Sequence, residues 1–243
     1  MLLIPGILAS SLVQAKSYRD TILDDSPRGF WMFDETSGST AEDSTSFNND
    51  LTFQNSPTLN VSTGLTGITK AITLNGSNQR AISTLNLAHF NINPSGNWSM
   101  EIWLKFSTSN FGSAYIIRND DASSLTQLAG IFVNNGLAGR IQVQALNSTT
   151  AAAVTLNSDG GWNDNTWHQV VVTAASGGAM RLYVDKVEKA SSTTARYSNT
   201  SNKTIYVGSN VSSQYYNGSL TVPAIYNTTL SLSQIETHYD KGI

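Results

Sequence analysis

The sequence predicts an all-β protein, built as a two-sheet antiparallel sandwich. Charged residues make up only 13% of the 243 residues, and Ser, Thr and Asn supply most of the polarity. These residue types favour turns and strand surfaces over helix interiors. Short β-rich runs recur roughly every ten residues with turn signals between them, which is typical of a sandwich. The chain length is ordinary for a single domain of this kind.

The first half of the chain contains strands expected at residues 29–33, 71–74, 81–85 and 98–106. The second of these ends at Asn75-Gly76, a strong turn signal. In residues 98–106, apolar side chains from Met100 to Phe106 alternate along the run and share one face. Residues 36–69 are rich in Ser, Thr and Asn, so we expect long loops there.

The second half contains strands expected at residues 115–118, 130–133, 140–145, 167–174, 180–185, 204–208 and 218–224. Asn134-Asn135-Gly136 predicts a hairpin between the second and third of these. The valines at 170–172 predict a strand buried on both faces. Pro223 has no N–H group, so the last strand is expected to be an edge or to carry a bulge there. Residues 107–114 and 190–203 resemble loops.

Two segments favour helix. Residues 18–25 predict a short helical turn that Pro27 ends. Residues 231–239 predict a short C-terminal helix, with Ser231 as its N-cap and Gly242 just beyond.

We divide the chain into an N-terminal extended arm, residues 1–17, and one domain, residues 18–243. The arm either packs on neighbouring subunits or lies across its own sandwich. Residues 13–15 resemble a signal-peptidase site, but no Lys or Arg precedes the apolar run and Pro5-Gly6 interrupts it. We therefore expect an arm, and no run is long enough for a membrane span. Its candidate assembly side chains are Leu2, Leu3, Ile4, Ile7, Leu8, Leu12 and Val13.

Short motifs occur in a fixed order along the chain. The first runs from Asp25-Ser26-Pro27 through Phe30-Trp31 to Gly38, and the others lie at residues 71–76, 100–105, 167–170, 182–185, 205–208 and 218–235. Together they resemble the laminin-G-like domain, a concanavalin-A-like lectin and glucanase jelly roll. The resemblance implies a jelly-roll sandwich whose function is adhesion, recognition or assembly.

The phrase from Tyr18 to Pro27, close behind a short arm, also resembles small virion proteins of tailed bacteriophages that carry this domain. This resemblance implies a virion location, as a capsid decoration or tail component. The partners would then be other virion proteins or copies of the same chain, in a homo-oligomer.

Composition narrows the partners further. The chain has no Cys, which excludes a disulfide framework and favours a bacterial or viral protein over an animal extracellular one. The net charge is -3 and no basic patch is visible, so nucleic acid is not an expected partner.

Catalytic groups are not evident in the sequence. A glycosidase needs two carboxylates roughly 5–10 Å apart, and no phrase of the form Glu-x-Asp-x-x-Glu occurs. Asp34 and Glu35 are adjacent, and Glu101 stands alone on its strand. The histidines lack metal-ligand spacing; we expect His168 to be structural, His238 to be solvated and His89 to lie in a loop.

Calcium is the one cofactor that the laminin-G-like resemblance implies. The candidate ligands are oxygen donors in or beside strand connections: Asp120 and Asp121 first, with Asn75 and Asn78. The alternative is ordinary turn chemistry, because Asn and Asp bond their own backbone in turns.

A glycan site needs an exposed aromatic ring beside planar polar groups. Two loop clusters have this mixture, Trp162-Asn163-Asp164 and Tyr215-Tyr216-Asn217. The alternative for both is loop packing. Trp31, Trp103 and Trp167 fall in predicted strands, where we expect them in the core.

Three functions are therefore weighed. The first is a non-enzymatic virion structural or accessory protein, attached through its arm, whose lectin-like sandwich contacts host-surface glycans. The second is a secreted or cell-surface glycan-binding adhesion module. The third is a glycoside hydrolase of the same fold. The first accounts for the arm, the lack of Cys and the lack of a carboxylate pair.

Overall fold

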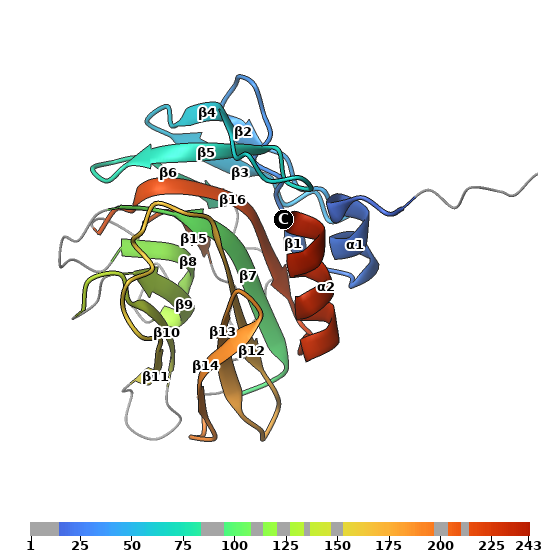
Figure 1. Ribbon diagram of the computed structural model, residues 1–243, viewed down its shortest axis with the longest axis vertical. Helices are drawn as coiled ribbons and strands as arrows, with labels where there is room; N and C mark the ends of the chain where they lie inside the picture. Colours follow the sequence, from blue (N-terminus) through green and yellow to red (C-terminus); the bar gives the residue numbers. More distant parts are fainter. Residues whose placement is uncertain are drawn as a thin grey trace, which may run out of the picture.

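The computed structural model of the chain describes residues 15–83, 95–107, 114–120, 127–133, 137–146, 153–196, 204–209 and 214–243. These residues form two antiparallel sheets packed face to face, with two short helices against the outer face of one sheet (Figure 1). The predicted all-β jelly-roll sandwich with a C-terminal helix is confirmed.

One sheet, the helix-covered sheet, is all antiparallel. Its strand order is β14 (Val187–Ser192), β13 (Met180–Val184), β12 (His168–Ala174), β7 (Trp98–Lys105), β16 (Asn217–Tyr226), β5 (Lys70–Asn75) and β4 (Thr58–Ser62). The short strand β1 (Gly29–Phe30) pairs with the far end of β16. Strand β7 therefore lies near the centre, with long neighbours on both sides.

The second sheet is also antiparallel. Its order is β11 (Ala153–Asn157), β10 (Ile141–Leu146), β9 (Gln127–Val133), β8 (Ala114–Asp120), β15 (Thr204–Val207), β6 (Arg80–Ser83), β3 (Leu51–Gln54) and β2 (Thr40–Ala41). The predicted hairpin of β9 and β10 is confirmed by their pairing. Residues 134–136, which prompted that prediction, lie outside the described residues.

Both predicted helices are present, but α2 extends beyond the predicted residue 239 and includes Gly242, which was expected just after the helix. Helix α1 (Tyr18–Asp24) is N-capped by Ser17, the last residue of the predicted arm. Helix α2 (Leu232–Gly242) begins after Ser231, whose side chain forms a capping box with Gln234. Neither described helix has the length and apolar character needed to cross a membrane.

The expectation of long loops at residues 36–69 is wrong, because β2, β3 and β4 lie there. Strand β14 likewise extends into the predicted loop at 190–203, and β11 was not predicted. These strands are short. In β3, for example, only Leu51 and Phe53 are buried, so the alternating pattern is too brief to stand out from a Ser/Thr/Asn-rich background.

The hydrophobic core divides into two clusters. The inner cluster lies between the sheets and includes Met100, Ile102 and Leu104 of β7. The outer cluster lies between the helix-covered sheet and the helices, and includes Trp103 of β7 and Ile235 of α2. Strand β12 is buried along its whole length, as the valine run predicted.

The strand that contains Pro223 was predicted to be an edge strand or to carry a bulge at this residue. Strand β16 pairs with both β5 and β7, so it is not an edge. Its register with β7 shifts between Thr221 and Ala224, around Pro223. The predicted bulge is therefore correct. It places Pro223, which has no N–H group, at a position that has no partner residue on β7.

Asp43 organises the loop that follows the opening aromatic motif. Its Oδ1 accepts the backbone N–H groups of Phe30 (3.1 Å) and Thr45 (3.0 Å). Its Oδ2 accepts the Thr45 hydroxyl (2.7 Å) and the backbone N–H of Asn49 (2.9 Å). One buried carboxylate thus ties β1 to the loop between β2 and β3.

Replacing Asp43 by Ala should lower the free energy of unfolding by roughly 3 kcal/mol, because buried N–H donors would lose a charged acceptor. Chemical denaturation measures this change. The matched control is Glu42→Ala, an exposed neighbour that should stay within about 0.5 kcal/mol of the parent. Equal stability of the two variants would contradict the role given to Asp43.

Candidate functional site

One end of the helix-covered sheet collects several residues that the sequence predicted for binding. The loop at residues 158–167, between β11 and β12, carries Trp162 and Asp164. Several backbone bonds fasten it; for example, Trp162 N donates to Gly139 O (3.1 Å), and Asn165 N donates to Phe106 O (2.9 Å). We call residues 158–167 the Trp162 loop.

Trp162 is half-buried and packs against the inner cluster. Its Nε1 donates to Asp159 Oδ1 at 3.3 Å. The Lys189 ammonium lies 4.8 Å from the ring centroid, and the His168 ring meets the indole at 4.9 Å and 82°. The indole is therefore held in one orientation at the surface, with a flexible lysine over it.

His168 is the next residue inward. Its Nδ1 lies 2.7 Å from Asp185 Oδ2, and its Nε2 lies 3.1 Å from Asp164 Oδ1. Burial lowers the pKa of His168, but the hydrogen bonds to Asp185 and Asp164 outweigh burial and raise this pKa above its ordinary value. The structural role predicted for His168 agrees with these contacts, which join the Trp162 loop to the turn after β13.

Thr166, His168 and Asp185 have the spacing of a nucleophile, base and orienting carboxylate. The Nε2 of His168 lies 3.0 Å from the Thr166 hydroxyl. However, that hydroxyl donates to Asp164 Oδ1 (2.8 Å), and both nitrogens of the imidazole face carboxylates. These contacts position the loop and do not prepare Thr166 as a nucleophile.

The second predicted glycan cluster is only partly at the surface. Tyr216 is 0% exposed and its hydroxyl donates to Lys105 O at 3.1 Å, so it is a core residue and its assignment to a glycan site is wrong. Tyr215 is half-buried, and Asn217 is exposed at the start of β16 opposite Asn75. Both lie at the same end of the sheet as the Trp162 loop.

The predicted calcium ligands are not brought together. Asn75 Oδ1 accepts hydrogen bonds from the backbone N–H groups of Ser77 and Asn78. These asparagines therefore form a turn, which was the alternative to a calcium site. Asp120 pairs with Thr204 at the first residue of β15. Strand β6, which follows Asn78, pairs with the other end of β15, at Tyr206 and Val207. No cluster of three or more His, Asp or Glu residues in the described part of the chain has metal-binding geometry. Asp121 lies outside the described residues, and calcium there stays a prediction.

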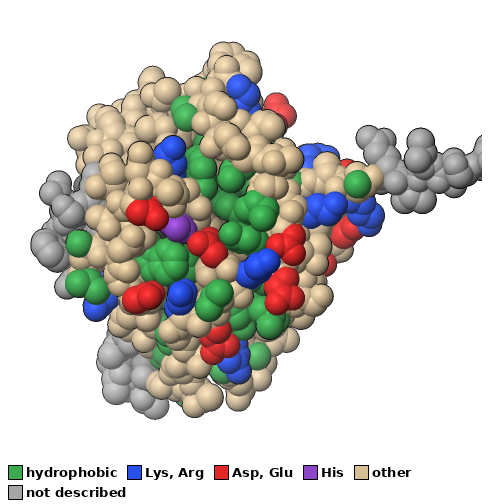
Figure 2. Space-filling model, viewed as in Figure 1, with side chains coloured by type: hydrophobic (Ala, Val, Ile, Leu, Met, Phe, Trp, Pro, Cys, Tyr) green, Lys and Arg blue, Asp and Glu red, His purple; other side chains and the backbone are tan. Residues whose placement is uncertain are grey.

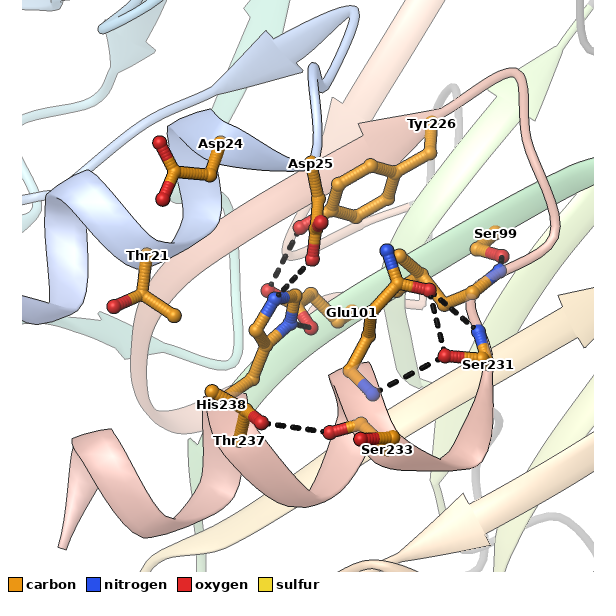
Figure 3. A network of polar contacts seen from close by, with 12 residues as sticks. Thr21, Asp24, Asp25, Ser99, Glu101, Tyr226, Ser231, Ser233, Thr237 and His238 are labelled. Atoms are coloured by element: carbon orange, nitrogen blue, oxygen red, sulfur yellow. Dashed lines mark hydrogen bonds and ion pairs between the residues drawn. The ribbon is translucent and has the colours of Figure 1, made fainter.

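The prediction that His238 is solvated is wrong. His238 is 0% exposed and lies between two carboxylates, with Nδ1 2.8 Å from Glu101 Oε2 and Nε2 2.8 Å from Asp25 Oδ2 (Figure 3). Glu101, which the sequence left alone on its strand, is also 0% exposed and accepts the Tyr226 hydroxyl (3.1 Å). We call Asp25, His238 and Glu101 the buried clamp.

The clamp keeps His238 charged. Burial lowers the pKa of His238, but the charge of Glu101 and the hydrogen bonds to Glu101 and Asp25 raise it to about 9. The sequence held one signal for this burial. His238 follows Ile235 by three residues, and both belong to the buried face of α2.

The sequence and the fold are both similar to those of known proteins. The family model described as the concanavalin A-like lectin/glucanases superfamily matches residues 75–236. The chain belongs to this superfamily. No curated protein sequence matches it.

Solved structures with a similar fold include toxin domains. The botulinum neurotoxin serotype D binding domain has a TM-score of 0.68 and 19% identity, over 89% of this chain and 52% of that one. The serotype D ligand binding domain in complex with N-acetylneuraminic acid has a TM-score of 0.68 and 19% identity, over 92% and 52%. These similarities show the fold, and the chain spans about half of each toxin domain.

About a third of an enzyme chain also shares the fold. Trypanosoma rangeli sialidase in complex with the inhibitor DANA has a TM-score of 0.62 and 16% identity, over 87% of this chain and 32% of that one. A shared fold does not by itself decide between binding and hydrolysis.

Trp31 and Trp103 are buried in the core, as predicted. Trp167 differs, because it is half-buried: its Nε1 donates to Thr63 O, and Lys105 lies over its ring. His89 lies outside the described residues.

The pKa of His168 should be measured by NMR titration and should exceed the ordinary value of about 6.5. Because the folded pKa is raised, His168 stabilises the fold fully below about pH 6.5, and this contribution is lost as the pH rises through the folded pKa. Asp185→Asn should lower the pKa, since it removes one carboxylate. Asp159→Asn is the control and should leave it unchanged. A pKa insensitive to Asp185→Asn would contradict the assignment.

Proposed function

We propose that this protein is a non-enzymatic, lectin-like glycan-binding domain, and that the Trp162 loop binds the sugar. The observation that carries the proposal is the Trp162 ring, held at the surface beside the exposed carboxylate of Asp164. Sugar rings stack on aromatic faces, and their hydroxyls pair with planar carboxylates and amides. Asn163 supplies an amide in the same loop.

The lysine over the indole fits this role. Lys189 has a long, flexible side chain, so a sugar ring can displace it and stack on Trp162 in its place. The His168 contacts hold the loop beforehand, which lowers the ordering cost of binding. Figure 2 shows hydrophobic, acidic and basic side chains interspersed on the face that carries β12, β13 and β14.

Binding is proposed over hydrolysis because of how the carboxylates are used. Asp164 and Asp185 both bond to His168, so neither is positioned as a free acid or nucleophile. The toxin domains named above support a binding role by analogy, since one is titled as a complex with N-acetylneuraminic acid.

We further propose that the domain is a virion structural or accessory protein, anchored by residues 1–14 and contacting host-surface glycans. The apolar side chains of this segment are the support, because full burial of each such side chain contributes roughly 1.5–3 kcal/mol. The alternative is a secreted or cell-surface adhesion module, which would use the same Trp162 loop.

The glycan proposal is tested on immobilised lactose, sialyllactose and N-acetylglucosamine oligomers. Trp162→Ala should weaken binding to the preferred sugar by at least about tenfold, equivalent to about 1.4 kcal/mol. Leu232→Ala, an exposed apolar residue on α2, is the matched control and should bind like the parent. Unchanged binding by Trp162→Ala, or release of free sugar from the oligomers, would contradict the proposal.

The anchoring proposal is tested by the solution mass of the full chain and of a version lacking residues 1–14. This truncation keeps Lys16, which pairs with Asp24, and the N-cap Ser17. We expect an oligomer for the full chain and a folded monomer for the truncation. Two identical monomers would show that these residues do not drive self-assembly.

A further inference from the structure

The buried clamp joins three segments that are distant in the sequence. Asp25 follows α1, Glu101 lies on β7 and His238 lies on α2, as Figure 3 shows. Helices α1 and α2 also contact each other. We call α1, Asp25 and α2 the helical cover, because they lie together against the outer face of the helix-covered sheet (Figure 1).

The cover has a hydrophobic cluster separate from that of the sandwich. Tyr18 and Ile22 of α1 and Ile235 of α2 belong to the outer cluster, whereas the inner cluster lies between the two sheets. Loss of the cover would therefore leave the inner cluster closed. Elements with this arrangement can open as local units while the rest of a domain stays folded.

The interface beneath the cover is incompletely paired. Among the described residues there, both amide atoms of the Gln169 side chain are buried without a hydrogen-bond partner. Gln169 lies directly opposite Trp103 on the neighbouring strand. Each unpaired buried polar atom opposes docking. The clamp therefore adds to the apolar contacts of the outer cluster in holding the cover in place.

The clamp requires a protonated imidazole. The ionisable groups that face His238 are Glu101 from β7, Tyr226 from β16 and Asp25, which follows α1. Both ring nitrogens point at carboxylates, and a neutral imidazole has only one N–H group. Without the proton, one buried carboxylate would face a nitrogen lone pair.

We propose that the buried clamp is a release device, in which loss of the His238 proton frees the helical cover while the sandwich stays folded. Release uncovers an apolar face on the sheet. Its residues are Phe30, Trp103, Val171, Tyr183, Val222 and Tyr226.

The direction of the pH dependence follows from the raised pKa. The clamp contributes fully below about pH 6.5, the ordinary pKa of His, and its contribution is lost as the pH rises through about 9. Burial raises the pKa of Tyr18 and Tyr226 well above 10, so these hydroxyls stay neutral over the same range. The His238 proton is therefore the one that changes at this interface.

Amide hydrogen exchange of the full chain at pH 7 tests the proposal. In His238→Gln, protection of α1 and α2 should fall at least tenfold, while protection of β7 and β12 stays at the parent level. His168→Gln is the matched control, because it removes the other described histidine that lies between two carboxylates. The proposal is overturned if the helices keep their protection, or if helices and strands lose it together.

The parent chain gives a second test that does not depend on a variant folding. Exchange is followed from pH 7 to pH 10.5, with protection corrected for the intrinsic rate at each pH. Selective loss of helix protection centred near pH 9 supports the release device. Constant helix protection, or a single loss shared by helices and strands, overturns it.

Discussion

Strand β7 must bury both of its faces, and the rest of the structure depends on how it does so. One face carries Met100, Ile102 and Leu104 into the space between the sheets. The other carries Glu101 and Trp103 outward, where water would reach them on a bare sheet. The terminal helices cover that second face, and a buried carboxylate there needs a buried cation. His238 supplies it, so α2 pairs with the charge on the central strand as well as packing on the apolar outer cluster.

The same sheet holds a helix against its outer face and a polar loop at one end. At the Trp162 end, backbone bonds to Gly139 and Phe106 fix a polar loop on rigid strand ends. A second imidazole, His168, repeats the arrangement of the clamp, but it lies near the surface with Asp164 exposed beside it. The fold thus uses the same carboxylate–imidazole–carboxylate contact twice, once to hold a helix and once to hold a loop.

The sequence predicted most of the fold because long strands carry long patterns. The alternation of 98–106 and the valines at 170–172 identified β7 and β12, and turn glycines placed several of their neighbours. Short strands such as β2 and β3 were missed, since two buried residues do not make a period. The cap at Ser231 was predicted because capping is local.

The candidate site was less predictable, since its contacts are distant in the sequence. Trp162 and Asp164 were found from composition, whereas their connection to Asp185 and Lys189 depends on how β13 and β14 pair beside β12. Tyr216 was misplaced because a tyrosine in a loop-like phrase has no pattern that marks it as buried. His238 was misplaced for a related reason: its partners lie 137 and 213 residues away along the chain.

The two ends of the folded domain meet. The Lys241 side chain donates to the backbone carbonyl of Lys16, beside the contact between α1 and α2. A domain whose ends are adjacent can be inserted as a unit into a surface loop of another protein, since it enters and leaves at one place. The same adjacency permits circular permutation: a short linker could join the chain near Lys16 to the end of α2, with new ends opened in the exposed turn at Gly177. Such rearrangement would leave both sheets continuous.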